Sequence, residues 1–261
     1  MRFRTPQTFR FLSALLGGLI GVLLTAVLAT PAQATIIGST NDLHQIQNTT
    51  VNPYSAVVEI TLGTDDAGKS LGACTGWMYA PNMVATAAHC VYDPAYVAGG
   101  YFHVSGMKVY PGINGSTNAP YGSCGVVASR AADAYIGGDW RFDYAALKLN
   151  CSVGNQTGLL SYGLQPTVGY STRVVGYPHN GTLYPADTQW YSDGHVGTYD
   201  SYLVYYDNDT ETRMSGSPVM EWTGSAWNVI AIHSRGYDAN YNTGPRITSA
   251  VSNDLYNWQY M

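Results

Sequence analysis

Hydrophobic and polar positions alternate in short runs along most of the chain from residue 56 onwards. The runs are rich in Val, Ile, Thr and Tyr and are separated by Gly, Asn, Pro and Asp, which is typical of strands joined by turns. Many short strands of this kind indicate an all-β sandwich or barrel. We predict strands over residues 56–62, 74–79, 83–88, 101–110, 122–129, 144–149, 172–177, 202–206, 217–222 and 227–233.

A helical period occurs only at the C-terminal end of the chain. Val251, Leu255 and Trp258 recur at the spacing of one helix face. Ser249 precedes them and is a suitable N-cap, because its hydroxyl can accept a hydrogen bond from a free backbone N–H. We therefore predict a C-terminal α-helix that packs on the core.

The first 34 residues have the pattern of a secretory signal peptide. Three arginines come first, residues 11–29 are almost all apolar, and Ala32-Gln33-Ala34 offers small residues for cleavage. The alternative is an uncleaved membrane anchor, because the apolar run approaches the ~20 residues that span a bilayer. The glycines within the run and the Ala-Gln-Ala sequence favour cleavage. We expect residues 1–34 to be removed and the protein to be secreted and extracellular.

Composition and charge narrow the class of protein. The chain has 261 residues, of which 46% are hydrophobic and 11% charged, so it can form a sizeable core. Loss of residues 1–34 removes three of the 12 Lys and Arg and none of the 17 Asp and Glu, which leaves a formal charge of −8. Nucleic-acid binding needs clustered Lys and Arg, and the sequence has no such cluster. We expect no nucleic-acid partner and no membrane contact after cleavage.

Four cysteines follow the predicted signal peptide. An even number in a secreted chain indicates two disulfides, and their spacing fits neither a zinc site nor a redox pair. The residues alone leave three possible pairings of Cys74, Cys90, Cys124 and Cys151.

Three separated stretches carry residues suited to nucleophilic catalysis. Ser215 opens the turn Ser-Gly-Ser-Pro, His89 ends the run Thr-Ala-Ala-His, and Asp143 follows Arg-Phe. A serine hydroxyl needs a base to take its proton, and a histidine base needs a carboxylate to orient it. The order His, Asp, Ser is one of the known orders of such a triad. Alone, Ser-Gly-Ser-Pro is more simply an ordinary turn.

The chain resembles the chymotrypsin-like serine peptidases and, more closely, the bacterial glutamyl endopeptidases. The matching residues spread over nearly all of the chain after the signal peptide, so they are more specific than any single motif. They are Asp42, His44-Gln45-Ile46, Asn48-Thr49-Thr50, Cys74-Thr75-Gly76-Trp77-Met78, Thr86-Ala87-Ala88-His89-Cys90, Asp143-Tyr144, Gly176-Tyr177-Pro178, Thr188-Gln189-Trp190, Ser215-Gly216-Ser217-Pro218 and Ala231-Ile232-His233.

The resemblance implies an all-β fold of two six-stranded antiparallel β-barrels with a C-terminal α-helix. We assign residues 35–160 to an N-terminal barrel that carries His89 and Asp143. Residues 161–261 then form a C-terminal barrel that carries Ser215 and the helix. In the family the cysteine after the histidine closes a small loop, so we expect the disulfides Cys74–Cys90 and Cys124–Cys151.

The resemblance also implies the chemistry. Ser215 attacks the peptide carbonyl, His89 transfers the proton, Asp143 orients His89, and the N–H groups of Arg213 and Ser215 bind the oxyanion. We expect a monomer that hydrolyses proteins or peptides without a metal or other cofactor.

The implied specificity is cleavage after glutamate, and after aspartate less well. A buried carboxylate needs donors or a cation, which the family takes from a threonine, a histidine and the mature N-terminal amine. Here these are Thr210, His233 and the amine of Thr35 or Ile36, with Arg235 as a possible further charge. Without the resemblance, His233 is a core histidine and Thr210 an ordinary loop hydroxyl.

Three residues depart from the patterns of related enzymes and define the rival hypotheses. Arg213 stands where the glutamyl endopeptidases usually have glycine, and Met214 stands where trypsin-like enzymes have an aspartate that captures a new N-terminus. These two suggest a peptidase-fold binding protein with weak activity. Asp209 lies six residues before Ser215, where trypsin-like enzymes place the acid that selects Arg or Lys, and it suggests an Arg/Lys-preferring peptidase.

Overall fold

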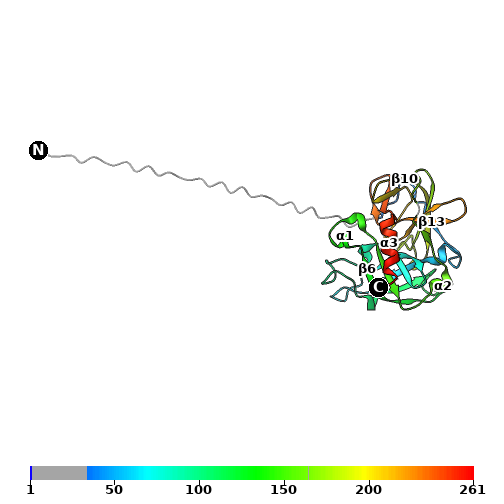
Figure 1. Cartoon of the computed structure of the whole chain (residues 1–261), viewed down its shortest axis with the longest axis horizontal. Helices are drawn as coiled ribbons and strands as arrows, with labels where there is room; N and C mark the ends of the chain where they lie inside the picture. The colour runs from blue at the N-terminus through cyan, green and yellow to red at the C-terminus, as the bar shows by residue number, and fades with distance from the viewer. Residues whose placement is uncertain (2–33, 164) are drawn as a thin grey trace. The chain divides into compact units, whose positions relative to one another are not determined.

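A computed structural model of the chain describes Met1, residues 34–163 and residues 165–261 (Figure 1). The chain divides into two units, residues 1–31 and 32–261, and the account below concerns the second. The predicted signal peptide lies almost wholly outside the described residues. No helix among the described residues has the length and apolarity needed to cross a bilayer.

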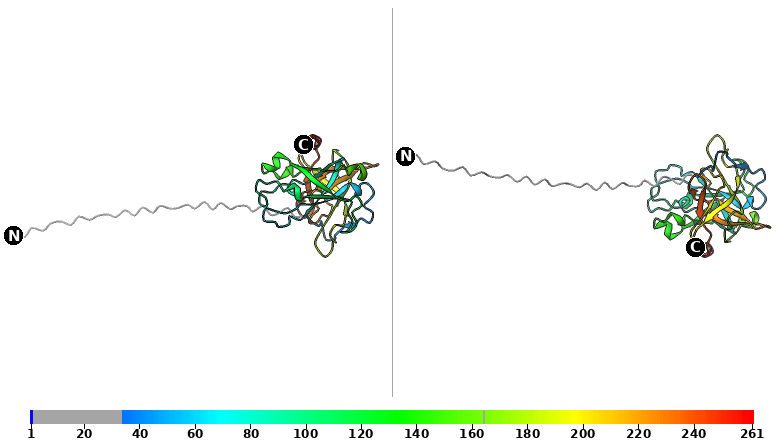
Figure 2. Two further views of the ribbon diagram at one scale, coloured as in Figure 1. Left: turned by 90° about the horizontal axis from the view of Figure 1, so that it is seen from below. Right: turned by 90° about the horizontal axis from the view of Figure 1, so that it is seen from above.

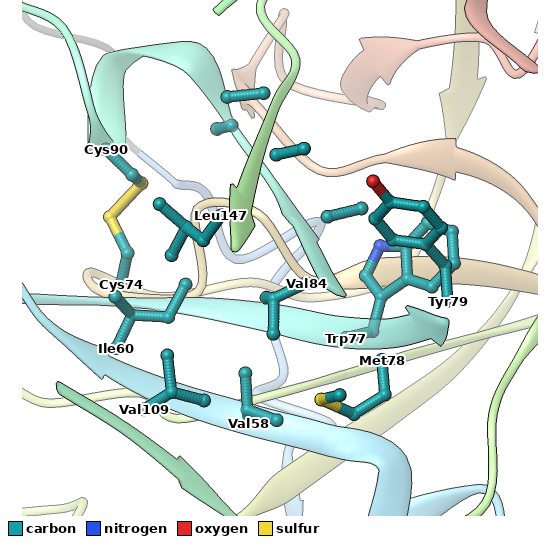
Figure 3. Packing of buried hydrophobic residues seen from close by; sticks show 14 of the residues in the cluster. Val58, Ile60, Cys74, Trp77, Met78, Tyr79, Val84, Cys90, Val109 and Leu147 are labelled. Carbon is teal, nitrogen blue, oxygen red and sulfur yellow. A yellow bond between two sulfur atoms is a disulfide. The ribbon is translucent and has the colours of Figure 1, made fainter. Parts of the chain in front are cut away.

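Six strands of the N-terminal half close into an antiparallel barrel in the order β2-β3-β4-β7-β6-β5. Alternate side chains of each strand point inward, and Val58, Ile60, Val84, Val109 and Leu147 fill part of the interior (Figure 3). The strands are β2 (Val57–Thr61), β3 (Ala73–Ala80), β4 (Met83–Thr86), β5 (Lys108–Pro111), β6 (Cys124–Ala131) and β7 (Ala145–Leu149).

The remaining described strands form one nine-stranded sheet in the order β14-β15-β11-β10-β9-β12-β13-β8, with β1 paired to β10. All pairs are antiparallel except β13 with β8. The structure therefore shows one closed barrel and a second sheet, and a second closed barrel stays a prediction. The strands are β1 (His44–Gln45), β8 (Ser161–Tyr162), β9 (Ser171–Gly176), β10 (Trp190–Tyr199), β11 (Leu203–Tyr206), β12 (Pro218–Trp222), β13 (Trp227–Ile232), β14 (Arg235–Gly236) and β15 (Asn242–Pro245).

The predicted C-terminal helix is present as α3 (Ser249–Trp258), drawn in red in Figure 1. Its N-cap is Thr248 and not Ser249, because the Thr248 side chain accepts from the Val251 N–H. Trp258 stacks on Tyr144, and Tyr144 donates to Asp254, so the helix packs beside β7. The other helical segments are α1 (Asp133–Ile136), α2 (Gly154–Thr157) and the 3₁₀ turns η1 (Tyr54–Ala56), η2 (Ala88–Cys90), η3 (Val104–Gly106) and η4 (Trp140–Phe142).

The structure contains both expected disulfides, Cys74–Cys90 and Cys124–Cys151. The first joins β3 to the turn η2 that follows β4, and its sulfurs are yellow in Figure 3. Figure 2 shows the same elements from two further directions. The sequence prediction missed five strands, namely β1, β8, β10, β14 and β15, of which β10 is the longest. Only the end of the strand expected over residues 101–110 is extended, as β5.

Candidate active site

The barrel brings His89 and Asp143 to the same edge. Strands β4 and β7 are antiparallel neighbours, and Thr86 at the end of β4 lies opposite Ala145 at the start of β7. His89 follows β4 in the turn η2, and Asp143 comes just before β7. Residues beyond these two ends therefore meet, although 54 positions separate them in the sequence.

Asp143 is fully buried and holds His89 at two points. One carboxylate oxygen lies 2.7 Å from His89 Nδ1, and the other accepts from the His89 backbone N–H at 2.9 Å. The Ser234 hydroxyl also donates to Asp143 at 2.5 Å. Burial alone would raise the pKa of Asp143, but His89 and these hydrogen bonds outweigh it and lower the pKa to about 2. Asp143 is therefore a carboxylate that fixes the imidazole with Nε2 free.

Ser215 lies in a turn that is fastened to both halves of the molecule. Its carbonyl accepts from the Thr75 N–H of the barrel at 2.9 Å, and the next N–H, of Gly216, donates to the His233 carbonyl at 2.8 Å. Gly216 has φ of +88°, and an added Cβ would lie 2.1 Å from the Thr75 carbonyl oxygen. The Ser-Gly-Ser-Pro turn thus needs glycine for its conformation and for its close approach to β3.

The hydroxyl of Ser215 forms no hydrogen bond with the described residues, so no such bond links it to His89 here. Its carbonyl lies 3.8 Å from Cys90 Sγ, which places the serine next to the residue after His89. Catalytic hydrogen bonds are often long or poorly aligned in free enzymes and tighten in the substrate complex.

Arg213, at the position where the resembling family usually has glycine, adopts a left-handed backbone conformation that favours glycine. Its φ is +74°, and among the described residues only Asp187 is another non-glycine with positive φ. This conformation costs about 1–3 kcal/mol and persists only where the surroundings enforce it. The Arg213 carbonyl accepts from Thr75 Oγ1 at 3.0 Å. Neither the Arg213 nor the Ser215 N–H has an acceptor among the described residues, so both can donate to an oxyanion.

His233 is a buried, uncharged imidazole with one unused nitrogen. Its Nδ1 lies 2.6 Å from the Tyr206 hydroxyl, whereas its Nε2 is buried and has no partner among the described residues. Burial, and then the nearby His89, lower the pKa of His233 to about 3. We assign the Tyr206 proton to this hydrogen bond, so the single imidazole N–H lies at Nε2 and is free to donate.

Thr210 contacts the segment that follows the predicted signal peptide. Its hydroxyl lies 3.2 Å from the Thr35 nitrogen, and its own N–H donates to the Thr35 carbonyl at 3.1 Å. Asn242 bonds both polar groups of Thr35 as well, at 3.2 and 2.7 Å. The structure therefore brings Thr35 to the candidate pocket residue Thr210.

Asp209 does not serve as a free pocket acid. Its side chain is buried, and its two oxygens accept from the N–H groups of Ile37 and Asp42, each at 2.6 Å. Both oxygens thus fasten residues 37–42 to the body of the protein. This geometry opposes the hypothesis that Asp209 selects a substrate Arg or Lys.

Arg235 groups with residues other than Thr210 and His233. Its guanidinium lies over the Trp140 ring at 4.8 Å, and its Nε lies 3.5 Å from Ser234 Oγ. It lies on the short strand β14, next in sequence to Ser234, which bonds Asp143. The predicted contribution of Arg235 to a carboxylate pocket stays a prediction.

Cys74, His89 and Cys90 place possible metal-ligand atoms within 4.8 Å of one another. The two sulfurs are bonded to each other, however, and a disulfide provides no thiolate ligand. These residues do not fit a zinc site.

Three contributing residues were missed in the sequence. Ser234, Tyr206 and Asn242 bond Asp143, His233 and Thr35, respectively. Ser234 is adjacent to His233, which is a weak signal for its place in the site. Tyr206 is one of 22 tyrosines, and Asn242 lies in a turn-like stretch, so neither stands out without the fold.

Comparison with known proteins gives consistent matches. The family model described as Trypsin matches residues 43–258. The chain is 37% identical over 233 residues to the glutamyl endopeptidase of Bacillus licheniformis, covering 86% of this chain and 69% of that protein. It is 34% identical over 232 residues to a Bacillus subtilis protein named extracellular metalloprotease, covering 86% and 70%.

Solved structures agree with the sequence matches. A structure described as Glu endopeptidase in complex with MPD superposes with a TM-score of 0.73 and 30% identity, covering 86% of this chain and 99% of the other. The protease Anisep from Arthrobacter nicotinovorans has a TM-score of 0.65 at 22% identity, over 83% and 98% of the two chains, and shows the likeness of fold alone. The resemblance predicted from the sequence is confirmed.

Proposed function

The chain belongs to the trypsin family of serine endopeptidases, and on this premise we propose that it cuts peptide bonds after glutamate, and after aspartate less well. In this proposal Ser215 is the nucleophile and His89 takes its proton and passes it to the leaving amine. Asp143 stabilises the imidazolium that forms. The N–H groups of Arg213 and Ser215 receive the oxyanion.

The observation that carries the glutamate preference is the unused Nε2–H of His233. A buried donor without an acceptor is costly, and a substrate carboxylate would satisfy it. The hydroxyl of Thr210 lies in the same half and already binds the Thr35 nitrogen. If cleavage follows Ala34, that nitrogen becomes an amine that adds a positive charge beside Thr210. A buried carboxylate needs this set of donors and charge.

The proposed setting is extracellular. Two disulfides suit an oxidising compartment, and the N-terminal sequence favours a cleaved signal peptide. We propose that the secreted protein acts as a monomer on proteins or peptides.

A panel of fluorogenic peptides that differ only before the cut bond tests the specificity. We expect the highest kcat/KM with Glu, a lower value with Asp, and no measurable cleavage after Arg or Lys. Cleavage after Arg without cleavage after Glu would contradict the proposal and support the rival hypothesis, in which Asp209 selects Arg or Lys.

Labelling with a serine-directed organophosphate tests the triad. We expect stoichiometric labelling that Ser215→Ala abolishes and Ser217→Ala retains. Ser217 is the matched control, because it lies in the same turn and its buried hydroxyl has no partner among the described residues. Absence of labelling in the unmodified protein would favour a peptidase-fold binding protein instead.

A further inference from the structure

A cavity of about 360 Å³ lies between the barrel and neighbouring loops. It adjoins the turn of residues 213–215, which supplies the proposed oxyanion donors. Three charged residues line it: Glu59 from β2, Asp187 from the loop before β10, and Arg213 from the turn before Ser215. The proposed mechanism uses only the backbone of Arg213 and neither of the two carboxylates. The rest of the lining is small or hydroxylated, with Thr61, Gly63, Thr64, Ser70, Gly72, Ala73 and Gly106.

Glu59 is 3% exposed and faces the outside of the barrel. Its neighbours Val58 and Ile60 point into the barrel (Figure 3), so the alternation of the strand turns Glu59 outward, under the covering loops. The hydrogen-bonding group beside it among the described residues is the Asp187 carboxyl, which is not a favourable partner for an ionised carboxylate. When Glu59 is ionised, no side chain of the described residues donates to it, and a buried carboxylate in that state needs a further partner.

The cavity adjoins the reacting centre through Thr75. Thr75 lies directly opposite Glu59 in the β2–β3 ladder. The same Thr75 bonds the carbonyls of Arg213 and Ser215. Glu59 is thus the direct cross-strand neighbour of Thr75, the residue that holds the turn with Arg213 and Ser215.

Strained backbone marks the same cavity. Asp187 with φ of 60° and Arg213 with φ of 74° are the two non-glycine residues of positive φ in the described part of the chain, and both line it. Left-handed conformations of such residues concentrate at functional sites and ligand clamps.

The charges of the cavity indicate the sign of its ligand. Two carboxylates face one guanidinium, and none of the six ion pairs of the described residues joins Arg213 to either carboxylate. One negative charge is therefore uncompensated when both acids are ionised. A cationic side chain with one positive charge would balance it, whereas a divalent metal ion would leave one positive charge in excess.

The position of the cavity indicates which part of a peptide would reach it. The proposed glutamate pocket, with His233 and Thr210, belongs to the C-terminal half of the molecule. The cavity is lined by Gly72 and Ala73, where β3 begins next to the Cys74–Cys90 disulfide, and by Arg213, two residues before Ser215. With the glutamate in the first pocket, this second pocket is left for the part of the peptide that follows the cut bond.

We propose that this cavity is a subsite for a lysine or arginine side chain in the leaving part of the peptide, bound by Glu59 and Asp187. The inference rests on the proposed endopeptidase function and deepens it. The enzyme then reads one acidic side chain before the cut bond and one basic side chain shortly after it.

The test uses peptides that share one sequence up to the cut bond and carry Ala, Lys, Arg or Glu at the first, second or third position after it. We expect kcat/KM to rise about tenfold for Lys or Arg over Ala at one of these positions, and to fall for Glu. Equal values for all four residues at every position would overturn the inference and leave the glutamate specificity intact.

Two variants locate the preference. Glu59→Gln keeps the shape and removes the charge, and Asp187→Asn does the same while tolerating positive φ. We expect each to reduce the basic preference to within about twofold while the all-Ala peptide is cut nearly as before. Asp133→Asn, at an exposed position, is the matched control and should retain the preference. A preference that survives in both cavity variants would overturn the assignment. Melting temperatures confirm that each variant is folded.

A binding measurement makes the result independent of turnover. With Ser215→Ala, titration calorimetry with the Lys peptide and the Ala peptide should give a Kd about tenfold lower for the Lys peptide. Equal affinities would overturn the inference even if no peptide were cleaved. A rise in melting temperature with calcium that Glu59→Gln abolishes would assign the cavity to a metal ion and would also overturn it.

Discussion

The closed barrel and the nine-stranded sheet bury different kinds of side chain. The barrel half buries mainly apolar side chains, with polar exceptions such as Glu59, Thr75, Thr86 and Asp143. Its contribution to the site comes from turns at one edge, which carry His89 and Asp143. The sheet half buries many polar side chains almost completely, namely Thr172, Gln189, Ser192, Asn208, Asp209, Thr210, Ser217, His233, Ser234, Asn242 and Thr243.

This difference shows how the two halves divide their tasks. An apolar interior gives a rigid frame whose edge positions are set by strand register. Buried polar groups need partners, and most of those in the sheet half bond one another or the segment after residue 34. Several buried polar atoms of this half lack a partner among the described residues, and of these the His233 Nε2 is the one that we propose for the substrate carboxylate.

The largest expected effect comes from Asp143, the residue held by both halves. We expect Asp143→Asn to lower kcat about 10⁴-fold, because the amide no longer fixes the correct tautomer of His89. Steady-state kinetics with a glutamyl peptide measures it. Ser234→Ala, which removes only the bond from the sheet half, should cost about tenfold. A loss as large as that of Asp143→Asn would mean that Ser234 has a role beyond positioning.

The next effect concerns His233 in the sheet half. We expect His233→Ala to lower kcat/KM for glutamyl peptides about a thousandfold, since a site built to hydrogen-bond a polar group loses its donor. Cleavage of a peptide with Ala before the cut should change little. Tyr206→Phe, which leaves His233 in place without its hydroxyl partner, should give a smaller loss. Equal losses for both peptides would show that His233 supports the fold and not the specificity.

Glu59 is a buried ionisable residue on the barrel, whose other buried side chains are mainly apolar. Burial, and then Asp187, raise the pKa of Glu59 from 4.5 to about 7. The folded protein therefore holds a proton that the unfolded chain releases, and stability falls as pH rises from about 4.5 to 7. Glu59→Gln does not titrate, so its stability relative to the unmodified protein should increase across this range, by at most about 3 kcal/mol. Urea unfolding at pH 4.5 and pH 8 measures the change. A difference independent of pH would contradict the assigned burial of the charge.

The smallest expected effect comes from Thr210. Thr210→Val keeps the shape of the side chain and removes the hydroxyl that meets the Thr35 nitrogen. We expect about a tenfold lower kcat/KM for glutamyl peptides, in line with the loss of one hydrogen bond. Asn242→Ala, which removes the other contacts to Thr35, is a useful comparison. No change in either variant would show that the contacts with Thr35 do not contribute to the binding of the substrate glutamate.

Much of the fold could be predicted from the sequence, because most strands have clear alternation and turn residues between them. Strand β10 was not predicted although it is the longest strand. It contains Asp193, Gly194 and Gly197, and hydrophobic and polar residues alternate along only part of it. Its extended form comes from pairing with β9 and β11, which is tertiary context. The helix cap shifted by one residue because both Thr248 and Ser249 are capable caps.

The candidate site was predictable where residues follow a family pattern and not where the fold decides the orientation. His89 and Asp143 do meet, as expected. Asp209 could not be assigned from its position six residues before Ser215, because its carboxylate turns to the N–H groups of Ile37 and Asp42. Arg213 adopts a positive φ that favours glycine, and the hydrogen bond from Thr75 to its carbonyl helps to hold that conformation. The sequence alone does not reveal this bond.

The docking of α3 on Tyr144 couples the candidate triad to a helix that lies far from it in the sequence. Tyr144 directly follows Asp143, donates to Asp254 and stacks on Trp258. The two residues of the hydrogen bond are 110 positions apart. A substitution that loosens α3 would therefore act at a distance on the backbone that positions the Asp143 carboxylate.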